Sequence, residues 1–157
     1  MDGYVVSTER VIPAPADKIF DLIADPSRHP DIDGSGTVKQ AKEAGQRVGL
    51  GDTFGMSMHM GISYTMANTV IEFEENRRIA WQTRVAGFLG SFVGGRIWRY
   101  ELEPVDGGTR VTESWDISED HQRMFLKRGP TEGHTKSSMD KTLARIEELV
   151  AGDPAPG

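Results

Sequence analysis

The stretch that decides the fold is residues 98–115, Trp98-Arg99-Tyr100-Glu101-Leu102-Glu103-Pro104-Val105-Asp106-Gly107-Gly108-Thr109-Arg110-Val111-Thr112-Glu113-Ser114-Trp115. Apolar and polar side chains alternate on both sides of a Gly-Gly turn, a pattern typical of two antiparallel strands joined by a short connection. Matching the faces of the strands fixes their register, because a slip of one residue would mix apolar with polar side chains. The expected cross-strand pairs are Trp98 with Trp115, Tyr100 with Glu113, Leu102 with Val111 and, on the other face, the opposite charges of Glu103 and Arg110.

This register places Glu113 on the aromatic, inward face of the hairpin. We expect burial to raise the pKa of its carboxyl group unless Arg96 or another cation reaches it. Tyr100 could polarise a substrate carbonyl while the carboxylate removes an adjacent proton, as an aldol or dehydration step requires. Alternatively, the two side chains form a structural polar pair in a cavity wall. Tyr100 and Glu113 are therefore the candidate catalytic residues, with both interpretations open.

Further strands are expected on the N-terminal side of this hairpin. Residues 5–12 are rich in β-branched side chains, and no helical period occurs between residues 37 and 116. The expected strands before the hairpin are 5–12, 37–41, 54–60, 64–73 and 79–85. Because the connections from residue 37 onward are short, neighbouring strands are expected to be antiparallel.

Helical spacing is found at the two ends of the chain. Residues 15–24 have one apolar face and start at a proline, which suits the first turn of a helix. A short helical turn is expected over 27–32, and another near 124–126. The last helix is expected over 131–150, where one apolar stripe contains Met139, Leu143, Ile146 and Val150. Residues 151–157 are expected to form a frayed tail.

The order of elements predicts an α+β protein with one domain over residues 1–150. A curved antiparallel sheet of seven strands would leave a broad apolar face uncovered, and only the C-terminal helix is long enough to cover it. The space between them must be filled by side chains or by a ligand.

Two motifs resemble the START-like, or SRPBCC, superfamily. They are Ile12-Pro13-Ala14-Pro15-Ala16-Asp17-Lys18-Ile19-Phe20-Asp21-Leu22-Ile23-Ala24-Asp25-Pro26 and Thr109-Arg110-Val111-Thr112-Glu113. The resemblance implies a helix-grip fold, and the superfamily contains polyketide cyclases and dehydratases, lipid-transfer domains, hormone receptors and allergen-like carriers. It supplies no invariant catalytic residue. A tryptophan common soon after the Asp-Pro pair is Ile32 here.

Composition excludes several classes of partner. Eighteen Lys and Arg against 24 Asp and Glu give a net charge of −6, which disfavours nucleic acid and anionic membranes. The chain has no Cys, no apolar run long enough for a membrane span and no signal-like N-terminus, so we expect a cytoplasmic protein. The spacing of its four histidines predicts no metal site, and no motif predicts a cofactor.

Methionines and aromatic residues supply the candidate ligand contacts. Methionines cluster in two adjacent expected strands and suit an irregular apolar surface, although they could equally be core filler. Residues 86–95 carry no charge, so Phe88 and Phe92 there could form a lid, a homodimer contact or part of the core. The expected ligand-binding residues are Met56, Met58, Met66, Trp81, Phe88, Phe92, Trp98, Tyr100, Glu113, Trp115, Met139 and Leu143.

Three functions follow as hypotheses. The first is binding of a small apolar molecule, lipid- or polyketide-like, between the sheet and the C-terminal helix. The second is a cyclase or dehydratase reaction on such a molecule. The third is a co-chaperone-like module that binds another protein. An acid–base group inside the pocket would favour catalysis over simple binding.

Overall fold

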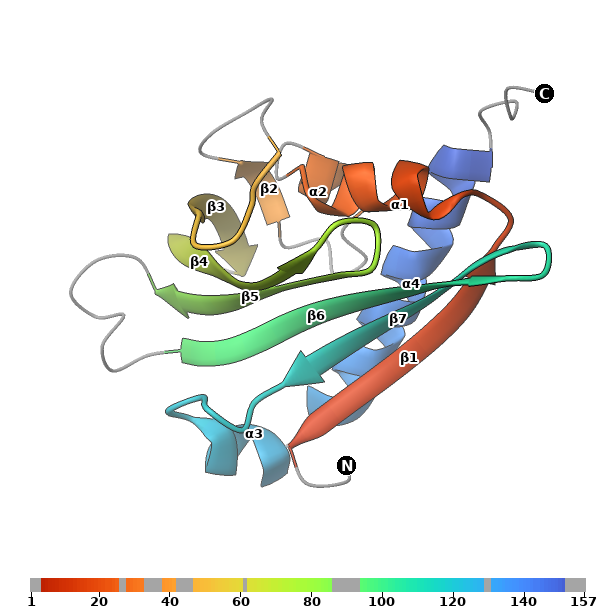
Figure 1. Cartoon of the computed structure of the whole chain (residues 1–157). Helices are drawn as coiled ribbons and strands as arrows, with labels where there is room; N and C mark the ends of the chain where they lie inside the picture. The colour runs from red at the N-terminus through yellow and green to blue at the C-terminus, as the bar shows by residue number, and fades with distance from the viewer. Residues whose placement is uncertain are drawn as a thin grey trace.

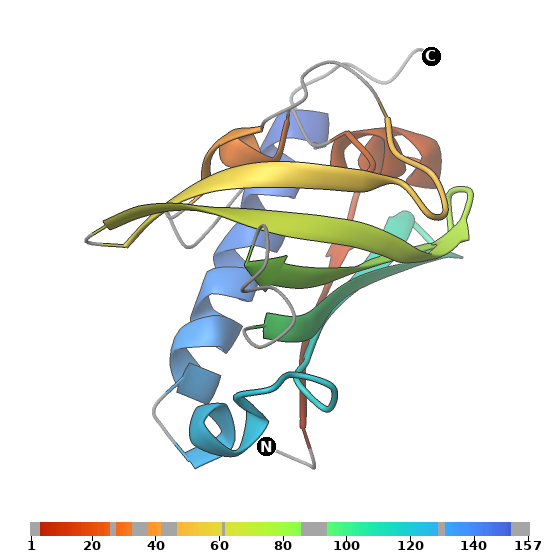
Figure 2. The same ribbon diagram turned by 90° about the vertical axis from the view of Figure 1, so that its left-hand side faces the viewer.

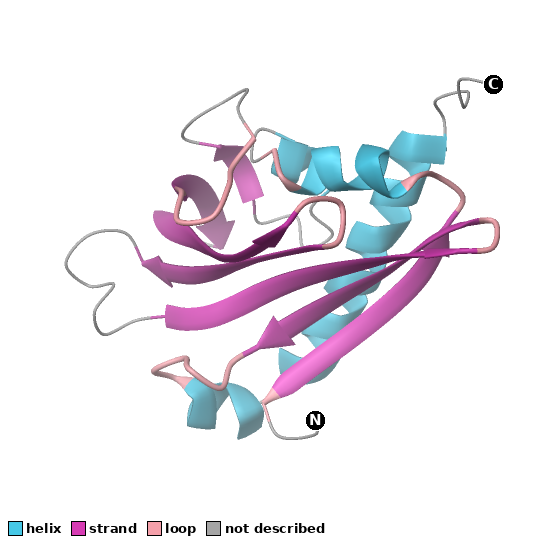
Figure 3. Ribbon diagram, viewed as in Figure 1, coloured by secondary structure: helices cyan, strands magenta, loops and turns pink. Residues whose placement is uncertain are grey.

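The computed structural model describes residues 4–25, 28–32, 38–41, 47–60, 62–85, 94–128 and 131–151. Figure 1 and Figure 3 show how the helices and strands are arranged. In chain order the elements are β1 (Val5–Ile12), α1 (Ala16–Ile23), α2 (His29–Ile32), β2 (Val38–Ala41), β3 (Thr53–Met60), β4 (Ile62–Glu74), β5 (Arg78–Val85), β6 (Gly94–Val105), β7 (Gly108–Asp116), α3 (Arg123–Arg128) and α4 (Thr131–Ala151).

The strands form one antiparallel sheet with the order β1-β7-β6-β5-β4-β3-β2. From β2 to β7 each strand pairs with the next along the chain, whereas β1 pairs with β7. Figure 2 shows the curved sheet with α4 running along one of its faces, called the inner face below. The prediction of an α+β protein with an antiparallel sheet and a long C-terminal helix is confirmed.

The register of the β6–β7 hairpin agrees with the sequence analysis. Trp98 lies opposite Trp115, Tyr100 opposite Glu113, and Leu102 opposite Val111. On the outer face Arg110 donates to a carboxylate oxygen of Glu103 at 3.1 Å. The alternation of apolar and polar residues was therefore enough to assign these side chains to the two faces of the sheet.

Helix α4 buries its apolar stripe against the inner face. Met139, Leu143, Ile146 and Val150 are all buried, as the spacing predicted. Two clusters of apolar side chains form the core, and the larger one includes Leu143. The smaller cluster contains Val6, Trp115, Ile117 and Met139.

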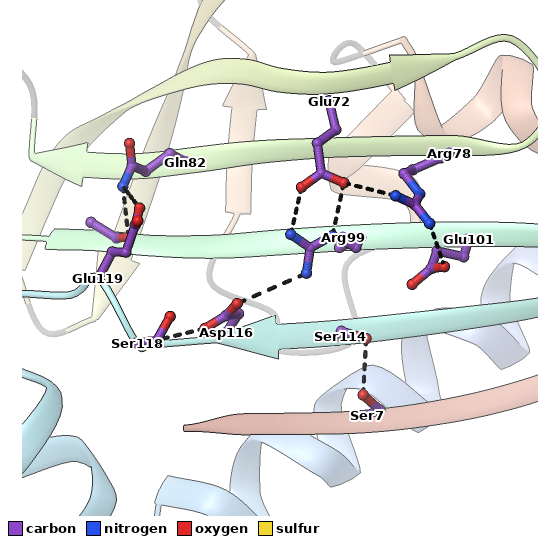
Figure 4. A network of polar contacts seen from close by, with 11 residues as sticks. Ser7, Glu72, Arg78, Gln82, Arg99, Glu101, Ser114, Asp116, Ser118 and Glu119 are labelled. Carbon is purple, nitrogen blue, oxygen red and sulfur yellow. Dashed lines mark hydrogen bonds and ion pairs between the residues drawn. The ribbon is translucent and has the colours of Figure 1, made fainter. Parts of the chain in front are cut away.

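The outer face is polar and carries a chain of charges across β4, β5, β6 and β7 (Figure 4). Arg99 donates to both carboxylate oxygens of Glu72, at 3.0 and 2.5 Å. Arg78 lies 3.5 Å from Glu72 and 3.1 Å from Glu101. The hydrogen bond from Arg99 lowers the pKa of Glu72 below its usual range, against a smaller opposing effect of burial.

Several predictions fall on residues that the structure does not describe. Phe88 and Phe92 lie in residues 86–93, so the lid, dimer and core interpretations all stay predictions. Residues 152–157 of the expected tail also lie outside the described part, and α4 ends at Ala151. Within the described ranges, no helix has both the length and the apolar character needed to cross a membrane.

Candidate functional site

Tyr100 and Glu113 form a buried hydrogen-bonded pair on the inner face. The Tyr100 hydroxyl donates to Oε2 of Glu113 at 3.0 Å. The two residues are 5% and 3% exposed. Their contact follows from the strand register, because β6 and β7 place them directly opposite one another. A phenol and a carboxyl group are therefore held together inside a mostly apolar face.

A polar row continues from this pair to the edge of the sheet. Thr8 of β1 lies opposite Glu113, and its hydroxyl donates to a carboxylate oxygen of Asp140 on α4. Along β7, Glu113 lies between Val111 of the larger apolar cluster and Trp115 of the smaller one. Glu113 thus lies at the boundary between the two clusters of the core.

Aromatic rings lie next to the polar pair on the inner face. The ring of Trp81 lies 5.7 Å from that of Tyr100, and Trp98 lies 6.3 Å from Trp115. Trp98 is partly buried and packs against both apolar clusters. It therefore bridges the two clusters beside the β6 end of the polar row.

His29 is a buried aromatic residue of this region that sequence reasoning did not select. Its ring stacks on Trp81 at 5.1 Å and meets Phe54 edge-on at 5.6 Å. Its Nε2 lies 2.8 Å from the carbonyl oxygen of Ile23. The sequence places His29 in the helical turn expected after the Asp25-Pro26 pair, but this does not predict its burial. Its contacts with Trp81 and Phe54 depend on tertiary packing.

The other expected ligand contacts are spread over this face. Trp81, Tyr100 and Leu143 belong to the larger cluster, whereas Trp115 and Met139 belong to the smaller. Met66 is buried on β4. Met56 and Met58 lie on β3, where Met56 is opposite Met66. The structure describes only the backbone of Met56 and Met58. Whether any of these residues contacts a ligand stays a prediction.

Arg96, the cation considered as a partner for Glu113, pairs elsewhere. Its Nε donates to Oδ2 of Asp120 at 3.0 Å, and the Asp120 side chain is fully buried. Asp120 lies in the loop after β7, and sequence reasoning did not identify it. Among the described residues, no group of three or more His, Asp or Glu side chains could hold a metal ion.

A surface depression of about 260 Å³ lies on the outer face, away from the Tyr100–Glu113 pair. Its lining is largely charged, so it differs from the apolar cavity expected beside α4. The lining residues are Glu74, Arg77, Arg78, Glu101, Leu102, Glu103, Arg110 and Thr112. Their arginines and glutamates largely pair with one another. We therefore place the candidate site on the inner face.

An antiparallel sheet curved about a C-terminal helix is the helix-grip-type fold of START-like proteins. The family described as "Polyketide cyclase / dehydrase and lipid transport" matches residues 4–151, and the chain belongs to it. The uncharacterised protein Rv0088 of Mycobacterium tuberculosis is 30% identical over 155 residues, which cover 93% of this chain and 64% of that protein. This chain thus corresponds to less than two thirds of the relative's length.

Solved structures show the same fold at low sequence identity. Protein CV1439 from Chromobacterium violaceum has a TM-score of 0.72 at 16% identity, covering 98% of this chain and all of the other. DynU16, a protein of the dynemicin biosynthetic locus, has a TM-score of 0.66 at 17% identity. That match covers 98% of this chain and 49% of DynU16. These similarities establish the fold alone.

Proposed function

We propose that the protein binds a small hydrophobic molecule, lipid- or polyketide-like, between the inner face of the sheet and α4. The observation that carries this proposal is the buried Tyr100–Glu113 pair beside the indole rings of the inner face. Ligand sites commonly combine such an apolar wall with a few polar groups that fix the ligand's orientation. The family description, which includes lipid transport, supports the same class of ligand.

Binding is tested by native mass spectrometry of the purified protein and by thermal unfolding with a panel of fatty acids and polyketide-like aromatic acids. A ligand present at 100 times its Kd should add about 2.7 kcal/mol to the free energy of unfolding. A raised Tm with a bound mass of one-to-one stoichiometry supports the proposal. If no compound shifts the Tm and no mass is retained, the co-chaperone-like interaction module becomes the better hypothesis.

A second candidate function is catalysis of an aldol cyclisation or dehydration on the bound molecule. It is favoured by the 3.0 Å contact between the Tyr100 hydroxyl and the Glu113 carboxylate, two groups able to polarise a carbonyl and to move a proton. The family description, which names polyketide cyclase and dehydrase, supports this second candidate.

Glu113→Gln separates catalysis from binding, because it keeps the shape of the side chain and removes its acid–base function. With a polyketide-like ligand identified by the binding assay, catalysis predicts loss of turnover in this variant while ligand affinity changes little. Tyr100→Phe serves as the partner variant and should lower turnover as well. If the wild type leaves the ligand chemically unchanged, the protein is a carrier and the catalytic candidate is wrong.

A further inference from the structure

Arg96 brings a positive charge to the inner face of the sheet. It lies on β6 opposite Thr83 of β5, two positions before Trp98. Because side chains alternate along a strand, Arg96, Trp98 and Tyr100 lie on the same face. The Arg96 side chain is 28% exposed, so solvent reaches it although the pair at Tyr100 is buried.

The guanidinium group of Arg96 is hydrogen-bonded through its Nε atom. Its Nε donates to Oδ2 of Asp120 at 3.0 Å, while Oδ1 of Asp120 accepts from the backbone N–H of Gln122 at 2.8 Å. Within the part of the chain that the structure describes, Arg96 pairs with Asp120, and its Nη1 and Nη2 groups donate no hydrogen bond. Two adjacent N–H groups are the donors that a carboxylate accepts most favourably.

The loop that carries Asp120 is fixed against the start of β6. The backbone N–H of His121 donates to the carbonyl of Gly94 at 2.9 Å, and the N–H of Gly94 donates to Oε1 of Gln122 at 3.0 Å. Asp120 is completely buried beneath these contacts. The orientation of the Arg96 guanidinium is therefore established before any ligand arrives, which lowers the entropic cost of binding.

We propose that Arg96 binds the carboxylate of the ligand, so that the ligand class is an amphipathic carboxylic acid whose apolar chain lies along Trp98. This inference rests on the proposed function and adds the chemistry of one end of the ligand. Arg96 and Tyr100 are four positions apart on β6, or about 13 Å at 3.3 Å per residue. An acyl chain of medium length spans the distance from the guanidinium to the Tyr100–Glu113 pair.

The proposal is tested by measuring the affinity of dodecanoic acid and of 1-dodecanol at pH 8 by displacement of an apolar fluorescent dye. The two probes share the chain and differ in the charged head. The wild type should bind the acid at least about tenfold more tightly than the alcohol, as expected for a charge-assisted pair of hydrogen bonds. Arg96→Gln should remove this preference by weakening acid binding and leaving alcohol binding unchanged.

Two further variants control for charge and for folding. Arg110→Gln removes the same charge from the exposed outer face and should keep the preference for the acid. Arg96→Gln leaves the buried Asp120 without its cation, so the double variant with Asp120→Asn repeats the test with both charges removed. Equal binding of acid and alcohol by the wild type, or a preference that survives in the double variant, overturns the role of Arg96 but not apolar ligand binding. Failure of both probes to bind the wild type contradicts the proposed function itself.

Discussion

Gly95 shows how closely the loop after β7 packs on the start of β6. Its φ of 110° lies in a region that favours glycine, and a Cβ there would lie 2.5 Å from the carbonyl oxygen of Glu119. The Gly95 carbonyl also accepts a hydrogen bond from the Gln82 side chain at 3.0 Å. No side chain fits at this position without moving the loop that holds Asp120.

We therefore expect Gly95→Ala to destabilise the protein by at least about 3 kcal/mol, because backbone strain and a steric clash add together. Gly107→Ala is the matched control, since Gly107 has a φ of 87° but open space around its Cβ position. It should cost only about 1–2 kcal/mol. Urea unfolding of both variants checks the difference. Equal costs would show that the loop yields easily and that Gly95 is constrained by φ alone.

At this scale the sequence predicts some side chains and misses others. Tyr100 and Glu113 could be paired from sequence alone. The alternation of apolar and polar residues, together with the opposite charges of Glu103 and Arg110, was compatible with one strand register. Asp120 could not be assigned, because it lies in a loop where no periodicity indicates burial. Its partner, Arg96, is brought to it by tertiary packing.

Helix α4 has one apolar stripe that is buried, whereas apolar residues off the stripe are partly exposed. Leu143 is 1% exposed and belongs to the larger core cluster, whereas Leu149 on the same helix is 38% exposed. The i, i+4 and i+7 spacing of the stripe predicted this division, because helical periodicity is a local property. The hydrogen bond from Thr8 to Asp140 was not predictable, since it depends on how the helix sits against β1.

Leu143→Ala is expected to lower the free energy of unfolding by about 2–5 kcal/mol, because it leaves a cavity in a packed core. The control, Leu149→Ala, removes the same atoms from a partly exposed position and should cost less than about 1 kcal/mol. Chemical denaturation measures both. Similar losses for the two variants would contradict the burial of the α4 stripe.

The outer face of the sheet gives a pH-dependent contribution to stability. The pKa of Glu72 is lowered in the folded protein, first by the hydrogen bond from Arg99. Its stabilising effect is present above the ordinary glutamate pKa and is lost as the pH falls through the lower folded value. Glu72→Gln should cost about 0.5–1 kcal/mol at pH 7, with the difference from wild type vanishing in strong acid. A difference that grows as the pH falls from 7 would contradict this pairing.

For the whole molecule, the topology gathers aromatic residues from separate strands on one face. Trp81 of β5, Trp98 of β6 and Trp115 of β7 lie side by side because their strands are neighbours in register. Short connections predicted the antiparallel pairs from β2 to β7. The pairing of β1 with β7 could not be derived from local patterns, because it joins strands that are distant in sequence.

This arrangement allows a direct measurement of where a ligand binds. The chain has three tryptophans, and all three lie on the inner face. Titration with 12-bromododecanoic acid should quench their fluorescence with saturation at one equivalent, because a bromine atom quenches an indole only at close range. Unbrominated dodecanoic acid is the control and should compete away the quenching. Stoichiometric binding of the brominated acid without loss of tryptophan fluorescence would place the ligand elsewhere and contradict a site between the inner face and α4.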